Sequence, residues 1–383
     1  MRICIVYDCF YPYTIGGAER WYQNLSRRLA EEGHEVSYLT LRHWERGSEP
    51  DVPGVRVVAV APRMQLYVGG RRRVMPPLAF GLGTFLHLLR HGRRYDIVHT
   101  ASFPYFSVLA AGALRRPAGY RLFVDWHEVW TLDYWRRYLG RGAGRIGSWV
   151  QGLCLRIPQH AFCFSRLHER RLLADHVRGE VTVLEGEFEG TAATAPRPAE
   201  PVVVFAGRHI PEKRPEAVVR AAARARETLP NLRAEIYGDG PEHGKVLAAI
   251  GELGLEGVAE APGFVDGAVV EDALARAVCL LLPTEREGYG LVVLEALSRG
   301  TPVVLVDGED NAALEHVAEG ENGFVAATAS PEDLGAAIVK VSEAGDALRN
   351  SALAWFKRNE NRLSLESSLA VVTDAYAGSS ARS

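Results

Sequence analysis

Two glutamates, Glu287 and Glu295, bracket a loop and the start of an expected helix, and this spacing suits recognition of an anion joined to hydroxyl groups. The apolar run 279–283 ends in a proline, and a glycine-bearing loop follows it. Unpaired amides in the first turn of a helix point toward an anion, and the helix dipole favours negative charge there. A carboxylate repels an anion, so the glutamates are expected to face hydroxyl donors. A sugar phosphate or a sugar nucleotide carries both kinds of group.

Two cations follow a second apolar run, 202–207. Arg208 ends this expected strand and Lys213 lies in the next loop. Arginine can grip a diphosphate with two hydrogen bonds, while lysine acts as a compact point charge. The alternative is a solvated loop paired with Glu212 or Glu216. The chain has four lysines against 40 arginines, and this scarcity favours a functional role for the lysine at 213.

Gly16 and Gly17 lie between the first expected strand and the first expected helix. Two glycines let the backbone approach a bulky anion without a Cβ in the way. A flexible turn is the alternative. No GxGxxG follows the strand, so a dinucleotide site is not expected.

His127 ends the expected strand 121–127, and an aromatic segment follows it with Trp130, Tyr134 and Trp135 at helical spacing. Sugars pack well on aromatic faces, so these three residues are candidates for an acceptor wall. A packed amphipathic helix is an equally good interpretation. His127 alone would more often be an ordinary loop residue than a ligand contact.

These residues need strands that end side by side. Short apolar runs alternate with helical patterns along the whole chain, which predicts two α/β domains, each a doubly wound parallel sheet of the Rossmann type. The expected strands are 2–8, 35–41, 55–61, 96–102, 121–127, 160–165 and 180–185 in the first half, and 202–207, 232–237, 258–265, 278–283, 302–306 and 323–326 in the second.

Domain boundaries follow from the same pattern. The proline-rich segment 189–201 has no periodicity and is the expected linker between domains 1–188 and 202–354. The last helix, within 355–383, is expected to cross back to the first domain. Ligand should bind in a cleft at the carboxyl ends of the strands, where two such domains face each other.

Composition sets the class of protein. The chain has 383 residues, of which 47% are hydrophobic and 24% charged, as in a soluble globular protein. A net charge of −3 gives no reason to expect nucleic acid as a partner. Five cysteines, an odd number, predict reduced thiols and a cytoplasmic location. The first strand starts at Arg2 with no signal peptide before it, and no apolar run approaches the ~18 residues that span a bilayer.

The segment EGYGLVVLEAL at 287–297 with the following glycine and PVV resembles the signature of the retaining GT-B glycosyltransferases of family 4, the glycosyl transferases group 1. Gly16–Gly17, Gly207–Arg208 with Lys213, and the run 238–241 occur in the order of that family. The resemblance spans nearly the whole chain and is strongest from about 202 to 325.

The resemblance implies roles for individual residues. Arg208 and Lys213 would hold the donor diphosphate, Glu287 the hydroxyls of the transferred sugar, and His127 the sugar near its O6. Glu295 would hold the ribose. Further donor contacts are expected from Gly16, Gly17, Gly238, Gly240, Gly288, Tyr289, Gly290 and Leu291. Arg214 departs from the usual glycine, and Glu128 follows His127 where relatives commonly have aspartate.

The resemblance therefore implies a retaining hexosyltransferase that uses a nucleotide-diphosphate sugar, with UDP as the commonest nucleotide of the family. The absence of Asp-x-Asp predicts activity without a metal, and no cofactor is expected. The acceptor is a small molecule or a glycan, with a lipid-linked acceptor left open. The run Arg71–Arg73 is a solvated loop or, at most, a peripheral membrane contact, and the oligomeric state is left open. A sugar-nucleotide epimerase, a phosphorylase, a nonenzymatic sugar-nucleotide sensor and an oxidoreductase are the alternatives.

Overall fold

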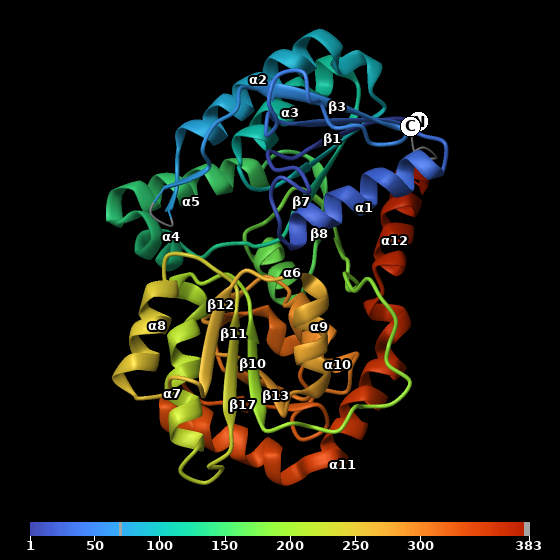
Figure 1. Cartoon of the computed structure of the whole chain (residues 1–383). Helices are drawn as coiled ribbons and strands as arrows, with labels where there is room; N and C mark the ends of the chain where they lie inside the picture. Colours follow the sequence, from blue (N-terminus) through green and yellow to red (C-terminus); the bar gives the residue numbers. More distant parts are fainter. Residues whose placement is uncertain (69–70, 379–383) are drawn as a thin grey trace. The chain divides into compact units, whose positions relative to one another are not determined.

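The structure of the protein, a computed structural model, describes residues 1–68 and 71–378, with the side chains of 67, 68, 71 and 72 outside the description. Arg71 and Arg72 of the basic run fall among these side chains. The chain divides into two compact units (Figure 1). Unit 1 consists of 1–185 with 366–383, and unit 2 of 186–365.

Unit 1 is built on a parallel sheet in which the strand order is β3-β2-β1-β6-β7-β8-β9. The strand order reverses between β1 and β6, so this is where a doubly wound sheet opens a crevice at its carboxyl edge. The strands are β1 (Arg2–Val6), β2 (Glu35–Leu41), β3 (Val55–Ala61), β6 (Ile97–Ala101), β7 (Arg121–Trp126), β8 (Gln159–Cys163) and β9 (Gly179–Val183). A two-stranded ribbon of β4 (Tyr67–Val68) and β5 (Arg71–Arg72) lies outside this sheet.

The helices of unit 1 bury one apolar stripe each. In α1 (Gly17–Glu31), Trp21, Leu25 and Leu29 recur every four residues and all three are buried. Between β3 and β6, α2 (Met75–His91) packs against α3 (Phe106–Ala118), and the pair covers the sheet. The remaining helices are α4 (Leu132–Leu139), α5 (Arg141–Leu155), α6 (Arg166–Ala174) and the C-terminal α12 (Leu365–Gly378).

Unit 2 repeats this architecture with the strand order β12-β11-β10-β13-β15-β17, all parallel. The central strands are apolar and fully buried, as a sheet covered on both faces requires. The strands are β10 (Val202–Ala206), β11 (Arg233–Tyr237), β12 (Ala259–Gly263), β13 (Cys279–Leu282), β15 (Val303–Val306) and β17 (Gly323–Ala326). The helices are α7 (Pro215–Ala225), α8 (His243–Glu252), α9 (Gly267–Arg276), α10 (Leu291–Leu297) and α11 (Pro331–Leu363).

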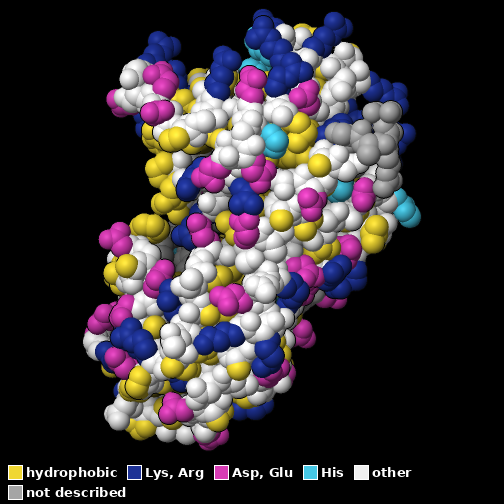
Figure 2. All heavy atoms as spheres, turned by 90° about the vertical axis from the view of Figure 1, so that its right-hand side faces the viewer, with side chains coloured by type: hydrophobic (Ala, Val, Ile, Leu, Met, Phe, Trp, Pro, Cys, Tyr) yellow, Lys and Arg dark blue, Asp and Glu magenta, His cyan; other side chains and the backbone are white. Residues whose placement is uncertain are grey.

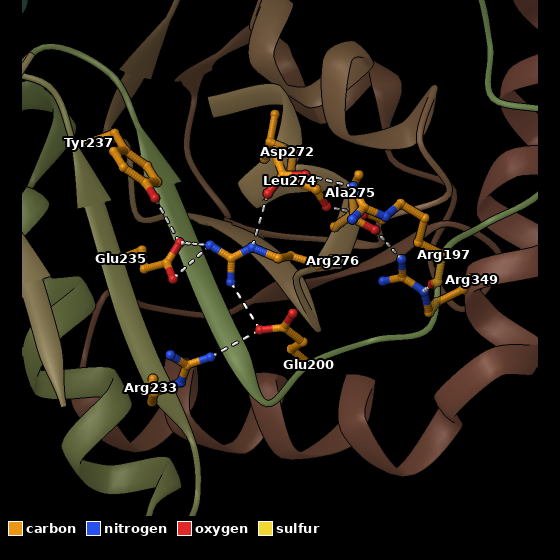
Figure 3. Close-up of polar contacts among 11 residues, drawn as sticks. Arg197, Glu200, Arg233, Glu235, Tyr237, Asp272, Leu274, Ala275, Arg276 and Arg349 are labelled. Atoms are coloured by element: carbon orange, nitrogen blue, oxygen red, sulfur yellow. Dashed lines mark hydrogen bonds and ion pairs between the residues drawn. The ribbon is translucent and has the colours of Figure 1, made fainter. Parts of the chain in front are cut away.

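An ion-pair network ties the amino ends of these strands to α9 (Figure 3). The guanidinium of Arg276 donates two hydrogen bonds to the Glu235 carboxylate, at 2.9 and 2.7 Å, and a third to Glu200 at 3.2 Å. The phenol of Tyr237 donates to the same Glu235 carboxylate at 2.7 Å. Arg276 also pairs with Asp272 on its own helix. Within this network the charge of Arg276 is balanced by carboxylates of the protein itself. The network stabilises the amino-terminal edge of the sheet, opposite the edge where the strands end.

The fold class predicted from the sequence is confirmed, and each expected strand has a counterpart whose ends differ by no more than two residues. The two compact units begin and end at other residues than the expected domains 1–188 and 202–354. The proline-rich segment 189–201 belongs to unit 2, where the Ala193 amide donates to the Ser298 carbonyl at 2.8 Å. Residues 355–365 also belong to unit 2, and the chain re-enters unit 1 at Glu366.

The five cysteines are free thiols and all are buried. Burial raises the pKa of the Cys279 thiol to about 12, which makes it unreactive at neutral pH. None of the helices in the described part of the chain is long and apolar enough to cross a membrane.

Candidate active site

The loops after β10 and β13 carry most of the predicted chemistry, and the strands that precede them are neighbours in the sheet. Val203 pairs with Cys279 and Val204 with Leu280. Because β10 and β13 flank the point where the strand order of unit 2 reverses, their carboxyl ends open onto the crevice that doubly wound sheets use for ligands. Arg208 follows the first strand and Glu287 the second.

Lys213 and Glu287 form an ion pair in which both side chains are only 16% exposed. The Gly288 amide donates to the other carboxylate oxygen of Glu287 at 3.2 Å. Burial alone would raise the pKa of the Glu287 carboxyl, but Lys213, the Gly288 amide and the nearby positive charge of Arg208 together hold it below its ordinary value. Glu287 is therefore an ionised acceptor at neutral pH, suited to hydroxyl donors. The structure brings together Arg208, Lys213, Glu287 and Gly288, as the sequence predicts.

Two features that the sequence did not reveal hold Glu287 in place. Residues Arg286–Glu287 form a short strand, β14, that pairs with β16 (Asp310–Asn311). The buried Asn311 side chain donates to the carbonyls of Thr284 at 3.4 Å and Val306 at 3.0 Å, which ties the loop after β13 to the end of β15. Strands of two residues carry no periodic pattern, so only the three-dimensional pairing identifies them.

The loops after β10 and β13 are also joined directly. The Glu285 amide donates to the Glu212 carbonyl at 2.8 Å, and the Arg214 guanidinium donates to the Glu285 carboxylate at 2.8 Å. Arg214 has a left-handed backbone, with φ +47° and ψ +50°, immediately before α7. This conformation explains the glycine that is usual here, because a side chain strains it. The loop keeps its shape with an arginine, whose side chain gains the Glu285 partner.

Gly238 and Gly240 lie against the loop after β10. A Cβ at Gly238 would stand 1.9 Å from the Gly207 carbonyl oxygen, and one at Gly240 would stand 2.5 Å from the His209 carbonyl oxygen. Both glycines also have positive φ. The backbone on either side of Arg208 therefore leaves no room for a side chain at these two positions. Contact of the two glycines with the sugar donor stays a prediction.

Around the start of α10, Gly290 is held at φ +90°, and a Cβ there would stand 2.5 Å from the Ala313 side chain. Tyr289 is buried, and its hydroxyl accepts a hydrogen bond from the Glu187 amide at 3.1 Å. Leu291 and Glu295 are half-buried on the helix itself. The tyrosine side chain thus holds the loop through the Glu187 amide, and the phosphate contact of the backbone beside it stays a prediction.

In unit 1, His127 follows β7 and stacks on Phe164, with ring centroids 4.5 Å apart and planes inclined by 6°. The Tyr22 ring of α1 meets it edge-on at 6.0 Å. Burial lowers the pKa of His127 to about 4, against a smaller opposing effect of Asp125. Its buried Nε2 has no hydrogen-bond partner in the structure. A neutral imidazole with an unpartnered nitrogen at a strand tip is suited to a ligand hydroxyl.

Gly16 and Gly17 begin α1. Gly16 caps the helix in an extended conformation, and a Cβ there would stand 2.5 Å from a Glu19 carboxylate oxygen. A Cβ at Gly17 would meet nothing within 4 Å, so the space beside its backbone is open. The open space agrees with the predicted approach of a ligand at Gly17, while Gly16 makes room for Glu19.

The three aromatic candidates differ in accessibility. Tyr134 and Trp135 are buried, 6% and 4% exposed, and the Trp135 indole donates to the Gln151 side chain of α5 at 3.1 Å. Trp135 packs α4 onto α5, and Tyr134 is buried next to it in the chain, as the amphipathic-helix interpretation proposed. Trp130 is half-buried and stacks on Phe103, with centroids 5.7 Å apart. Of the three aromatic candidates, Trp130 is thus the one whose ring is most accessible to an acceptor.

A buried polar network beneath His127 escaped sequence analysis. One His99 ring nitrogen lies 2.7 Å from the Asp125 carboxylate and the other 2.5 Å from the Tyr376 hydroxyl of α12. The Trp21 indole donates to the second Asp125 oxygen at 2.8 Å. Tyr376 is 277 residues from His99 in the chain, so no local pattern could have linked them. The network docks the C-terminal helix into the core of unit 1.

Within residues 1–68 and 71–378, the structure brings together no group of three or more His, Cys, Asp and Glu side chains able to hold a metal ion. The candidate site near the ends of β10 and β13 instead includes a lysine, an arginine and a carboxylate, with the Arg214–Glu285 ion pair beside them. Positive charge next to an ionised carboxylate would suit a ligand that carries both negative charge and hydroxyl donors.

Two family models match the chain, one after the other. The model "Glycosyl transferase 4-like domain" matches residues 16–185, and the model "Glycosyl transferases group 1" matches 190–355. The chain belongs to the group 1 glycosyltransferases. The resemblance to the group 1 glycosyltransferases seen in the sequence is thereby confirmed, and the protein is a glycosyltransferase with the GT-B fold.

Relatives in sequence agree with this family, and solved structures share the fold. Glycogen synthase of Mycobacterium tuberculosis is 27% identical over 94% of this chain and 90% of its own length. Sucrose-phosphate synthase from Thermosynechococcus elongatus shares the fold over the full length of both chains, with a TM-score of 0.81 and 19% identity. Alr3699/HepE of Anabaena, solved in complex with UDP and glucose, covers 98% of this chain and 99% of its own, with a TM-score of 0.71 and 15% identity.

Proposed function

We propose that this glycosyltransferase transfers a hexose from a UDP-linked donor to an acceptor hydroxyl, with retention of anomeric configuration and without a metal. The observation that carries the proposal is the ionised Glu287 beside Lys213 and Arg208. A diphosphate needs compact positive charge, and a hexose needs a hydrogen-bond acceptor next to it. The HepE structure, which holds UDP and glucose on a similar fold, supports the choice of donor.

In the proposed reaction, the bond between the sugar C1 and the diphosphate oxygen breaks while the acceptor oxygen forms the new bond to C1. The acceptor attacks the face from which the nucleotide leaves, and a phosphate oxygen takes its proton. Negative charge grows on the leaving diphosphate, so fixed positive groups act most strongly in the transition state. Arg208 and Lys213 would supply that charge, and the amides near Tyr289 and Gly17 would add hydrogen bonds.

Glu287 would orient the sugar rather than attack it. Its negative charge is balanced by Lys213 and by the Gly288 amide, which makes it a weak nucleophile and a good acceptor for hexose hydroxyls. Glu295, in the second turn of α10, would bind the ribose. The neutral His127 would bind the hexose near O6. Each of these assignments follows the family pattern residue by residue.

Calorimetric titration with UDP, GDP and ADP, followed by UDP-hexoses, tests the donor. UDP should bind more tightly than the other nucleotides, and the Lys213→Ala and Glu287→Ala variants should each lose about 10²–10³ in turnover. Normal turnover in both variants would contradict the proposed roles.

Proton NMR of the first product identifies the reaction. The glycosyl product, or hexose released slowly into water, should keep the anomeric configuration of the donor, and EDTA should leave the rate unchanged. An inverted product, or a rate restored only by Mn²⁺ or Mg²⁺, would refute the corresponding part of the proposal. Conversion of the donor into an epimer without any acceptor would indicate an epimerase instead.

A further inference from the structure

The outer face of α2 is apolar along its whole length. Five residues share it, at intervals of three or four: Met75, Leu78, Leu82, Leu86 and Leu89. At 100° per residue they fall within an arc of about 80°. All five are exposed, Leu82 and Leu89 by 61% and 60%.

The opposite side of α2 already has its partners. Phe80, Thr84 and Leu88 are buried, and a Cβ at Gly81 would stand 2.4 Å from the Phe106 side chain of α3. The helix therefore packs through one face and presents a second, fully apolar face outward. A surface helix of a soluble protein normally places polar side chains there. A row of apolar residues of this length marks a docking surface.

Charge identifies what docks. No acidic residue occurs between Asp51 and Asp96, whereas eight arginines do. The exposed arginines Arg73, Arg90 and Arg93 stand at or just beyond the two ends of α2. Residues 1–185 contain 26 arginines against 16 acidic residues, although the whole chain has a net charge of −3. In Figure 2, lysine and arginine side chains gather at the upper end of the molecule, which belongs to unit 1.

We propose that this face of unit 1 binds the surface of an anionic lipid membrane, with α2 lying in the plane of the interface. Apolar side chains between arginines are the combination that such helices use, since the leucines enter the acyl boundary while the arginines reach the headgroups. A second copy of the chain fits less well, because its own arginines would face these.

The inference goes beyond the proposed function and does not depend on it. Flotation of the full-length protein with vesicles of phosphatidylcholine containing 30% phosphatidylglycerol, and with vesicles of phosphatidylcholine alone, measures it directly. We expect flotation with the anionic vesicles, little with the neutral ones, and loss of binding in 0.5 M NaCl.

Two pairs of variants test the face. Leu82→Asp/Leu89→Asp should weaken binding at least about tenfold, because each leucine loses its burial in lipid, while Leu247→Asp, at a 50% exposed leucine of α8, should not. Arg90→Glu/Arg93→Glu should weaken it by more than about tenfold. The matched reversal Arg170→Glu/Arg178→Glu, beside β9 at the other edge of the sheet, should have a smaller effect. Unchanged circular dichroism establishes that each variant is folded.

Failure of the wild-type protein to float with anionic vesicles would overturn the proposal. Equal binding by Leu82→Asp/Leu89→Asp would overturn it as well. Light scattering in vesicle-free buffer measures the oligomeric state and so tests the alternative, a second copy of the chain. A wild-type dimer that becomes a monomer in Leu82→Asp/Leu89→Asp would assign the face to that second copy and overturn the proposal.

Discussion

Replacing Lys213 by methionine separates the chemistry of the Lys213–Glu287 pair from its contribution to stability. Methionine keeps most of the volume of the lysine stem but removes the charge that faces the Glu287 carboxylate. Both side chains are 16% exposed, so water can replace only part of the lost interaction. The variant therefore leaves a largely buried carboxylate beside the Gly288 amide and the more exposed Arg208.

The size of the effect follows from this burial. Removing one partner of a fully buried pair costs about 3–5 kcal/mol, and partial access to water together with the two remaining partners reduces this to about 2–3 kcal/mol. For a unit of roughly 180 residues, that loss lowers the thermal midpoint by about 4–12 °C at pH 8. Scanning calorimetry of the full chain measures the transition of unit 2.

The sign of the pH dependence reverses in the variant. In the wild type the folded pKa of Glu287 lies below its ordinary value, so the group stabilises the fold above its unfolded pKa and this stabilisation is lost as pH falls. In Lys213→Met, burial is opposed less and the folded pKa rises, so the fold becomes less stable as pH rises. The difference between the two proteins should therefore shrink between pH 8 and pH 4.

The double variant Lys213→Met/Glu287→Gln decides the interpretation. Neutralising both partners of a buried pair is often neutral for stability, so the double variant should recover most of the lost midpoint while remaining inactive. A double variant as unstable as the single one would refute the reasoning, because the loss would then come from packing rather than from an unpaired carboxylate. So would a pH-independent difference.

Three further outcomes are expected. Arg349 is buried and donates to the carbonyls of Arg197, Ala275 and Ala277 (Figure 3), so Arg349→Met should cost about 2–4 kcal/mol in calorimetry; a loss below ~1 kcal/mol would contradict this. Arg214→Gly should be about 1 kcal/mol more stable than Arg214→Ala, because only glycine relieves the left-handed backbone; equal midpoints would show that the loop relaxes. His127, with its pKa lowered to about 4, should be neutral by ¹⁵N NMR at pH 6, and its contribution to stability should fall as pH drops from 6.5 to 4; a protonated ring at pH 6 would exclude this.

The positions of the strands along the chain, and the strand ends that carry chemistry, could be predicted because both depend on local pattern. Buried runs such as 202–206 and 279–282 leave their period and composition in the sequence, and a parallel sheet then forces their carboxyl ends to one edge. That rule alone brings Arg208 and Glu287 together. The exact ends of the strands shift by a residue or two because fraying and loop hydrogen bonds decide them.

What the sequence could not show are contacts between residues far apart in the chain that share no pattern. The pairing of Glu287 with Asn311, and the contact of His99 with Tyr376, depend on how loops and helices return to the sheet. Burial also decided between the two interpretations of Tyr134 and Trp135. Their spacing suits either a sugar platform or a packed helix, and only the presence of α5 beside them favours packing.

The two ionic clusters of unit 2 show why a ligand is expected at one end of the sheet and not at the other. At the amino end, carboxylates of Glu235, Glu200 and Asp272 pair with the Arg276 guanidinium, so its charge is neutralised within the protein. At the carboxyl end, Lys213 and Glu287 neutralise each other while Arg208 stands exposed beside them. A pair buried this deeply stabilises a fold little compared with apolar residues of the same volume. Its position at the tip of the sheet, next to an exposed cation, is therefore better explained by the substrate it can orient than by the stability it adds.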